Sequence, residues 1–77
     1  MEIDKQIIRI IAETFNIPED KIDMESSNDT VEQWDSMGHL QLVMAVESEL
    51  KIHFNTNELE GLKSVKKLVD KVSSLLT

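Results

Sequence analysis

Isoleucine or phenylalanine recurs at every fourth position at the start of the chain, as Ile3, Ile7, Ile11 and Phe15. Residues four apart share one face of an α-helix, whereas a strand would alternate with a period of two. The helix should end near Asn16, because Pro18 lacks a backbone N–H and disfavours helical geometry at the residue before it. The first segment is therefore an amphipathic helix over residues 3–15 that needs a core to pack on.

Three more helical segments follow. Asp35 and Ser36 precede an apolar run to Leu50, which predicts an N-cap and a second long helix. Residues 51–55 are predicted to form a connector. Residues 56–60 are predicted to form a short helix that ends at Gly61. Ser64 can cap a closing helix, whose predicted apolar face is Val65, Leu68, Val69, Val72, Leu75 and Leu76. The prediction is a single all-α domain over 1–77, a small four-helix bundle of three long helices and one short one.

Residues 17–34 follow no period, and apolar residues occur singly as Ile17, Ile22, Met24, Val31 and Trp34. We interpret this segment as a long anchored loop between the first two long helices, running from one end of the bundle to the other. Thr30 and Gln33 have the spacing of a capping box, which predicts one short turn there. Loops of this length in compact domains are usually functional or disordered.

Composition excludes several classes of protein. At 77 residues the chain is too small to enclose an elaborate active site. It has no cysteine, so disulfides and thiolate metal sites are excluded, and His39 and His53 alone do not make a zinc site. The beginning of the chain fits neither a signal peptide nor a membrane span, which favours a cytoplasmic location.

Charge is unevenly distributed along the chain. There are 15 acidic and 8 basic residues, a formal net charge of −7, and the acids concentrate in residues 17–35 while the last fifteen residues are rich in lysine. A net negative charge repels nucleic-acid phosphates and anionic lipid headgroups. We therefore expect no nucleic-acid partner and no membrane insertion, and basic protein surfaces as the favoured partners of a monomer.

The second long helix has two apolar faces. Leu42, Val43, Val46 and Leu50 share one side, with His39 at its edge, which is typical of a core face. On the nearly opposite side, close to Gln41 and Ser48, the helix carries Met37, Leu40 and Met44. This second face is either a docking surface, for which methionine is well suited, or ordinary core covered by a neighbouring loop or by the short helix.

Ser36 is the candidate functional residue. A serine at the start of a helix places its oxygen beside unpaired backbone N–H groups and the positive end of the helix dipole, where a phosphodiester would be stabilised. Asp35 can cap the same helix end and fix the turn, and Gly38 leaves room for an incoming group. The alternative is that Asp35 and Ser36 do no more than cap the helix.

The segment from Trp34 to Leu50, with the run Asp35-Ser36-Met37 after an acidic loop, resembles the attachment segment of acyl carrier proteins. The resemblance extends over essentially the whole chain, in helix order, in the long first connection, in the short third helix and in total length. It implies a carrier and not an enzyme, with 4′-phosphopantetheine on the serine and an acyl thioester on the terminal thiol of that arm.

The same resemblance implies roles for individual residues. Ser36 would be the attachment point and Asp35 its preceding acid. The partner-binding residues would be Met37, Leu40, Gln41, Met44 and Glu47, the last as a charged contact. The implied partners are a phosphopantetheinyl transferase and acyl-loading and acyl-transfer enzymes that dock on the second helix through basic surfaces.

The chain departs from the family at several positions. Gly38, Gln41 and Ser48 stand where many fatty-acid carriers have acids, and Trp34 replaces a small residue, so docking electrostatics should be weaker. The run from 35 to 38, Asp-Ser-Met-Gly, also resembles D-alanyl carrier proteins, which use the same arm for an aminoacyl group. A specialised acyl carrier and an aminoacyl carrier are thus both consistent with the sequence.

Three hypotheses of another class fit parts of the sequence. A hydrolase using Ser36, His39 and Asp35 lacks the Gly-x-Ser-x-Gly nucleophile elbow. An acidic helical interaction domain without a prosthetic group would share the anionic middle and the second apolar face, and differs from the carrier only in leaving Ser36 unmodified.

The third hypothesis is a calcium-binding loop that begins at Asp23. Asp23, Glu25 and Ser27 occupy alternate positions, as the first ligands of an EF-hand loop do. Asn28 replaces its glycine and Trp34 its closing glutamate, so the loop fails at two defining positions. A solvated acidic surface is the simpler interpretation.

Overall fold

The computed structural model describes residues 3–76 and folds them into three α-helices and two short 3₁₀ helices. In chain order these are α1 (Ile3–Phe15), η1 (Glu19–Lys21), α2 (Ser36–Leu50), η2 (Thr56–Leu62) and α3 (Val65–Leu76). Within this range there is no strand, and no helix is long and apolar enough to cross a membrane. The predicted all-α fold is confirmed, and η1 is an addition to it.

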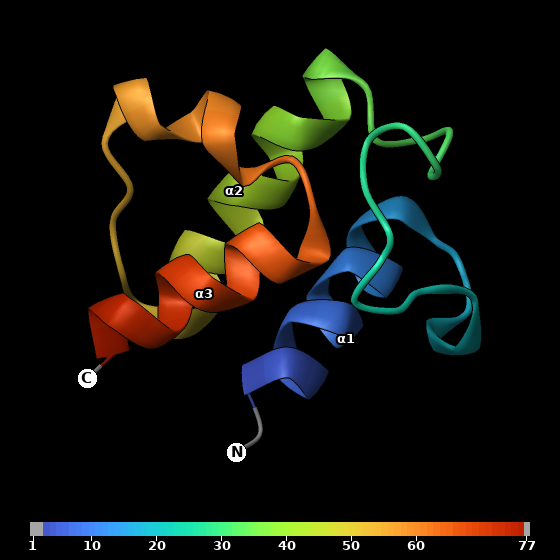
Figure 1. Cartoon of the computed structure of the whole chain (residues 1–77), viewed down its shortest axis with the longest axis horizontal. Coiled ribbons are helices and arrows are strands. Elements are labelled where there is room, and N and C mark those ends of the chain that lie inside the picture. Colours follow the sequence, from blue (N-terminus) through green and yellow to red (C-terminus); the bar gives the residue numbers. More distant parts are fainter. Residues whose placement is uncertain (1–2, 77) are drawn as a thin grey trace.

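α1 packs against both α2 and α3, and η2 packs on α3 (Figure 1). The residues spaced four apart in α1 are all buried, as the helical period predicts, and Leu42, Val43 and Val46 of α2 face them. From α3 the core receives Val65, Leu68 and Val72. The predicted face of α3 is too long, because its last two leucines, Leu75 and Leu76, are exposed.

Local chemistry sets most helix ends. Asn16, with φ 58°, ends α1 in the left-handed conformation that asparagine tolerates. Ser64 caps α3 as predicted, because its Oγ accepts the N–H of Lys67 at 3.1 Å. Gly61, predicted as a stop, lies inside η2 without a positive φ, and the chain leaves η2 through Lys63. That prediction was wrong because η2 does not end in a left-handed residue.

The long loop is anchored, as predicted, by the buried side chains of Ile22, Val31 and Trp34. Two backbone hydrogen bonds fix it to the start of α3: Val65 N–H donates to Ser26 O at 3.0 Å, and Asn28 N–H donates to Lys63 O at 3.1 Å. The loop therefore reaches α2 already held against the bundle (Figure 1).

The predicted turn near Thr30 exists, but without a capping box. The Thr30 Oγ1 accepts the Ser27 N–H at 2.9 Å and donates to Ser27 O at 3.2 Å. Its hydroxyl is thus used toward the preceding residues, and no helix starts there.

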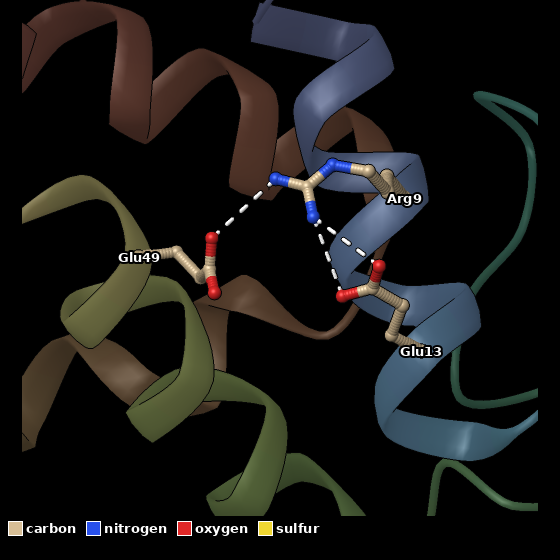
Figure 2. A network of polar contacts seen from close by, with 3 residues as sticks. All are labelled: Arg9, Glu13 and Glu49. Atoms are coloured by element: carbon tan, nitrogen blue, oxygen red, sulfur yellow. Dashed lines mark hydrogen bonds and ion pairs between the residues drawn. The ribbon is translucent and has the colours of Figure 1, made fainter.

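Two ion pairs join elements at the surface. Figure 2 shows the Arg9 guanidinium between Glu13, at 3.3 Å, and Glu49 of α2, at 3.4 Å. The hydrogen bond to Glu49, followed by the charge of Glu13, raises the pKa of Arg9. Exposed pairs of this kind contribute little stability, so the apolar core positions α1 against α2.

η2 is held on α3 by a second ion pair, in which Lys71 Nζ lies 2.8 Å from Glu58 Oε1. Asn55 Nδ2 donates to the other oxygen of the same carboxylate, also at 2.8 Å. Lys71 first, and then Asn55, lowers the pKa of Glu58, because both contacts favour its ionised form. These contacts hold the element that forms one wall of the candidate site.

Candidate functional site

The start of α2 is built by Asp35. Its backbone is extended, at φ −92° and ψ −168°, and its Oδ1 accepts the N–H of Gly38 at 2.8 Å. The carbonyl of Asp35 accepts the first helical bond, from His39 N–H at 2.7 Å. Asp35 is therefore the N-cap that the sequence predicts, and it sets the direction in which Ser36 leaves the chain.

Ser36 is exposed, and among residues 3–76 its hydroxyl has no hydrogen-bond partner. It opens onto a pocket of about 170 Å³. The other lining residues of this pocket come from α2, η2 and the turn after η2, and are His39, Leu40, Leu59, Glu60 and Lys63. Lys63 Nζ lies 3.1 Å from Glu60 Oε1 at this pocket.

This arrangement suits an anionic group on Ser36. The N–H groups of the first turn lack partners inside the helix, and the positive end of the α2 dipole points the same way. Gly38 N–H is already bonded to Asp35, which leaves the earlier N–H groups of the turn. The Lys63 ammonium adds a positive charge at the same pocket.

Gly38 does not leave room for an incoming group, contrary to the expectation from sequence. A Cβ at this position would lie 2.2 Å from the carbonyl oxygen of Gln33 and 3.0 Å from Cε1 of Phe15. The space that glycine leaves is filled by the end of the loop and by α1. Its role is to let α2 begin close against the backbone that precedes the motif.

Gly38→Ala is expected to destabilise the fold by about 1–3 kcal/mol, the usual cost of overpacking, although alanine is the better helix former. The Cβ would meet backbone, which cannot move aside as a flexible side chain can. Gly61→Ala is the matched control, because nothing lies within 4 Å of the added Cβ. Thermal melts followed by circular dichroism should show the loss for Gly38 alone; equal melting temperatures for both variants would contradict the close approach.

His39 is not available as a catalytic base. Its ring is buried, its Nε2 lies 2.7 Å from the carbonyl oxygen of Leu59, and its Nδ1 accepts the indole N–H of Trp34 at 2.9 Å. A carbonyl only accepts and an indole only donates, so the ring is neutral with its proton on Nε2. Both imidazole nitrogens are thus hydrogen-bonded inside the fold. The hydrolase hypothesis therefore loses its proposed base.

The second apolar face of α2 is exposed. Met37 is 69%, Leu40 50% and Met44 59% exposed, and no loop or short helix among residues 3–76 covers them. Gln41 lies on the same exposed side. We name Met37, Leu40 and Met44 the apolar strip. The sequence left open whether these residues are exposed or covered as core, and the structure shows them exposed.

The Glu47 carboxylate makes contacts within the protein. Its Oε2 accepts the backbone N–H of Phe54 at 2.8 Å and lies 3.5 Å from His53 Nδ1. The carboxylate therefore fixes the connector after α2. The predicted role of Glu47 as a charged partner contact remains a prediction, and a partner would compete with this internal bond.

The acidic start of the suspected calcium loop is used locally. Asp23 Oδ1 accepts the N–H of Glu25 at 2.9 Å and lies 3.4 Å from the Ser26 hydroxyl. Over residues 3–76 no group of three or more His, Cys, Asp or Glu side chains is placed to hold a metal ion. This segment is thus an ordinary turn stabilised by an aspartate.

Sequence reasoning missed part of the site. Leu59, Glu60 and Lys63 form the far wall of the pocket at Ser36, yet they lie more than twenty residues away along the chain. In the sequence, Lys63 is one of several lysines in the last fifteen residues. No local pattern marks these residues, because only the packing of η2 beside α2 brings them to the serine.

A small helical bundle with an exposed serine at a helix start, next to an uncovered apolar strip, has the arrangement expected of a carrier domain. No protein-family model matches the sequence. Two curated relatives are acyl carrier proteins: that of Petrotoga mobilis is 31% identical over 75 residues, covering 97% of this chain and 88% of the relative. That of Buchnera aphidicola subsp. Baizongia pistaciae is 37% identical over 68 residues, covering 88% and 87%.

A solved structure agrees. The solution NMR structure of holo acyl carrier protein from Geobacter metallireducens superposes with a TM-score of 0.86 at 30% identity, covering 99% of this chain and 87% of that one. The chain belongs to the acyl carrier protein family. The predicted family, fold and carrier function are confirmed, and the family consists of carriers that serve acyl-handling enzymes.

Proposed function

We propose that Ser36 is the attachment site of 4′-phosphopantetheine and that the chain carries acyl groups on that arm. The observation that carries the proposal is the Ser36 hydroxyl itself, exposed at the first residue of α2 and without a partner among residues 3–76. When bound, the prosthetic group supplies the thiol on which an acyl group is held as a thioester.

The residues of the chain fit such a group. Asp35 holds the turn, the α2 N-terminus and Lys63 favour the negative phosphodiester, and the pocket at Ser36 gives the first part of the arm an apolar wall at Leu40 and Leu59. Because the arm brings its own thiol, a carrier without cysteine is chemically complete.

The modifying partner is a phosphopantetheinyl transferase that uses coenzyme A. The Ser36 oxygen forms a bond to the phosphorus nearest pantetheine, the bond from that phosphorus to 3′,5′-ADP breaks, and the serine proton passes to a base of the transferase. The exposed hydroxyl makes this attack possible without unfolding. This chain supplies the nucleophile and the docking surface, and the transferase supplies the catalysis.

Acyl-loading and acyl-transfer enzymes with basic surfaces are the further partners. The net charge of −7 steers positive surfaces toward the chain, and the apolar strip gives them a contact on α2. The proposal takes residues 1–77 as one carrier domain that acts as a monomer in the cytoplasm, where the transferase finds coenzyme A.

Incubation with coenzyme A, magnesium and a transferase tests the proposal. Intact-mass measurement should show a gain of one phosphopantetheinyl group, and fragmentation of the protease-derived peptide should place it on Ser36. Other serines, such as Ser27 and Ser48, serve as internal controls in the same digest. A gain of mass located on another residue would contradict the assignment.

Met44→Glu is expected to lower turnover by a partner enzyme by roughly tenfold or more, since a charge enters the middle of an apolar contact. Stability should change by about 0.5 kcal/mol or less, because Met44 is an exposed residue on the helix surface. Leu75→Glu is the matched control, an exposed apolar residue on α3 with the same change in charge. Steady-state kinetics with the holo variants measure both, and equal kinetics for the two would argue against docking on α2.

A further inference from the structure

The pocket beside Ser36 lies at the proposed attachment point. Its walls are Leu40 on α2 and Leu59 on η2, and its volume is about 170 Å³. A cavity of roughly 150 Å³ holds a molecule the size of benzene. The pocket therefore has room for the first part of the arm but not for a long acyl chain as well.

Two lining residues of the pocket, His39 and Leu59, belong to a hydrogen-bonded chain of three residues that joins α2 to η2. Trp34 Nε1 donates to His39 Nδ1 at 2.9 Å, and His39 Nε2 donates to Leu59 O at 2.7 Å. Trp34 is 1% and His39 6% exposed. We name this chain of bonds the Trp34–His39–Leu59 relay; it connects the loop, α2 and η2.

Aromatic packing reinforces the relay. The Trp34 and His39 rings are stacked, with centroids 6.2 Å apart at an angle of 25°. On its other side Trp34 lies against Phe15 of α1, with ring centroids 6.0 Å apart. The indole and imidazole thus fill the space where α1, the loop and α2 meet.

A chain of methylene groups that entered between α2 and η2 would have to separate His39 from Leu59. The Leu59 carbonyl and one imidazole nitrogen would then lie against hydrocarbon. Hydrocarbon cannot form a hydrogen bond with either group, so both would lose a partner. Entry is therefore opposed by the relay itself and not only by close packing.

We propose that His39, through the relay, closes the bundle to acyl chains, so that this carrier leaves its cargo outside the helices whatever the chain length. The inference rests on the proposed attachment at Ser36. It gives the Trp34 and His39 pair a role in the carrier, which is to keep the acyl chain out of the bundle.

The test uses wild-type protein loaded by the transferase from butanoyl-, octanoyl- and dodecanoyl-coenzyme A. Cleavage of each thioester by hydroxylamine reports exposure of the cargo, and amide hydrogen exchange of α2 and η2 reports entry into the bundle. We expect the same cleavage rate and the same exchange for octanoyl and dodecanoyl forms as for butanoyl. Cleavage that slows stepwise with chain length, or exchange that falls with it, would overturn the inference.

His39→Thr removes the ring and both of its hydrogen bonds, and should make cleavage of the dodecanoyl form several-fold slower than that of the butanoyl form. His39→Gln is the matched control, because its amide can accept from Trp34 and donate to Leu59, and it should behave as wild type. A folded His39→Thr variant without any dependence on chain length would refute the role of His39.

If His39→Thr does not fold, the wild-type series still decides whether the bundle is closed, because any dependence on chain length overturns the inference. Failure of the attachment itself is distinguishable, because the wild-type protein would then gain no mass on Ser36 with any of the three donors.

Discussion

Replacing Ser36 with alanine is expected to abolish modification by the transferase completely. The substitution removes the one oxygen that the proposal requires, and no other change in the chain should compensate. Stability should change by about 0.5 kcal/mol or less, because the hydroxyl has no partner among residues 3–76 and alanine is a strong helix former. Intact mass after incubation with coenzyme A, with circular dichroism as the check on folding, measures both effects.

Ser48→Ala is the matched control for this experiment. Ser48 is also an exposed serine on α2, but it lies in the helix interior, away from the cap and from the pocket at Ser36. The control should be modified like wild type. A Ser36→Ala protein that still gains the full mass would move the attachment point elsewhere, and a wild-type protein left unmodified by several competent transferases would end the proposal.

The parts of the fold that sequence predicts are those fixed by neighbours in the chain. The helical period of α1, the Asp35 cap of α2 and the Ser64 cap of α3 each depend on residues within a few positions of one another. The same holds for Ser36, whose place at a helix start follows from the residue before it. Rules that relate neighbouring residues therefore predict both the order of the helices and the candidate site.

The wrong prediction for Gly38 concerns a contact that no local rule covers. Gly38 was expected to leave a space, and the space is taken by Gln33 and Phe15, which only packing places there. Glu47 accepts the N–H of Phe54 beyond the helix end, a contact that the sequence does not indicate, and its contact with partners stays a prediction. Gly61 had the residue type of a stop, but residue type does not fix where a 3₁₀ helix ends.

Trp34 and His39 show the same limit most clearly. The sequence placed His39 at the edge of the core face and Trp34 as an anchor of the loop, and both are buried as expected. They are five positions apart, and Trp34 lies outside α2, which starts at Ser36, so no helical period predicts their contact. Their hydrogen bond, and the one from His39 to Leu59, depend on how the loop and η2 close over α2.

His39→Leu is expected to destabilise the protein by about 1–3 kcal/mol, since it leaves the indole N–H of Trp34 buried without a partner and removes the bond to the half-buried Leu59 carbonyl. For a domain of this size that corresponds to a fall in melting temperature of roughly 4–24 °C. Urea unfolding followed by circular dichroism gives the free energy directly.

Trp34→Phe completes a double-mutant cycle with His39→Leu. Phenylalanine keeps an aromatic ring against Phe15 but removes the N–H donor, so in the double variant no indole donor is left unpaired. The free energy of unfolding lost in the double variant should then be smaller than the sum of the two single losses, by about 1 kcal/mol. Because the Trp34 and His39 rings also stack, the coupling measures the 2.9 Å hydrogen bond together with the change in stacking. Strict additivity would mean that burial of the two rings alone stabilises this part of the bundle, and the relay would then lose its energetic basis.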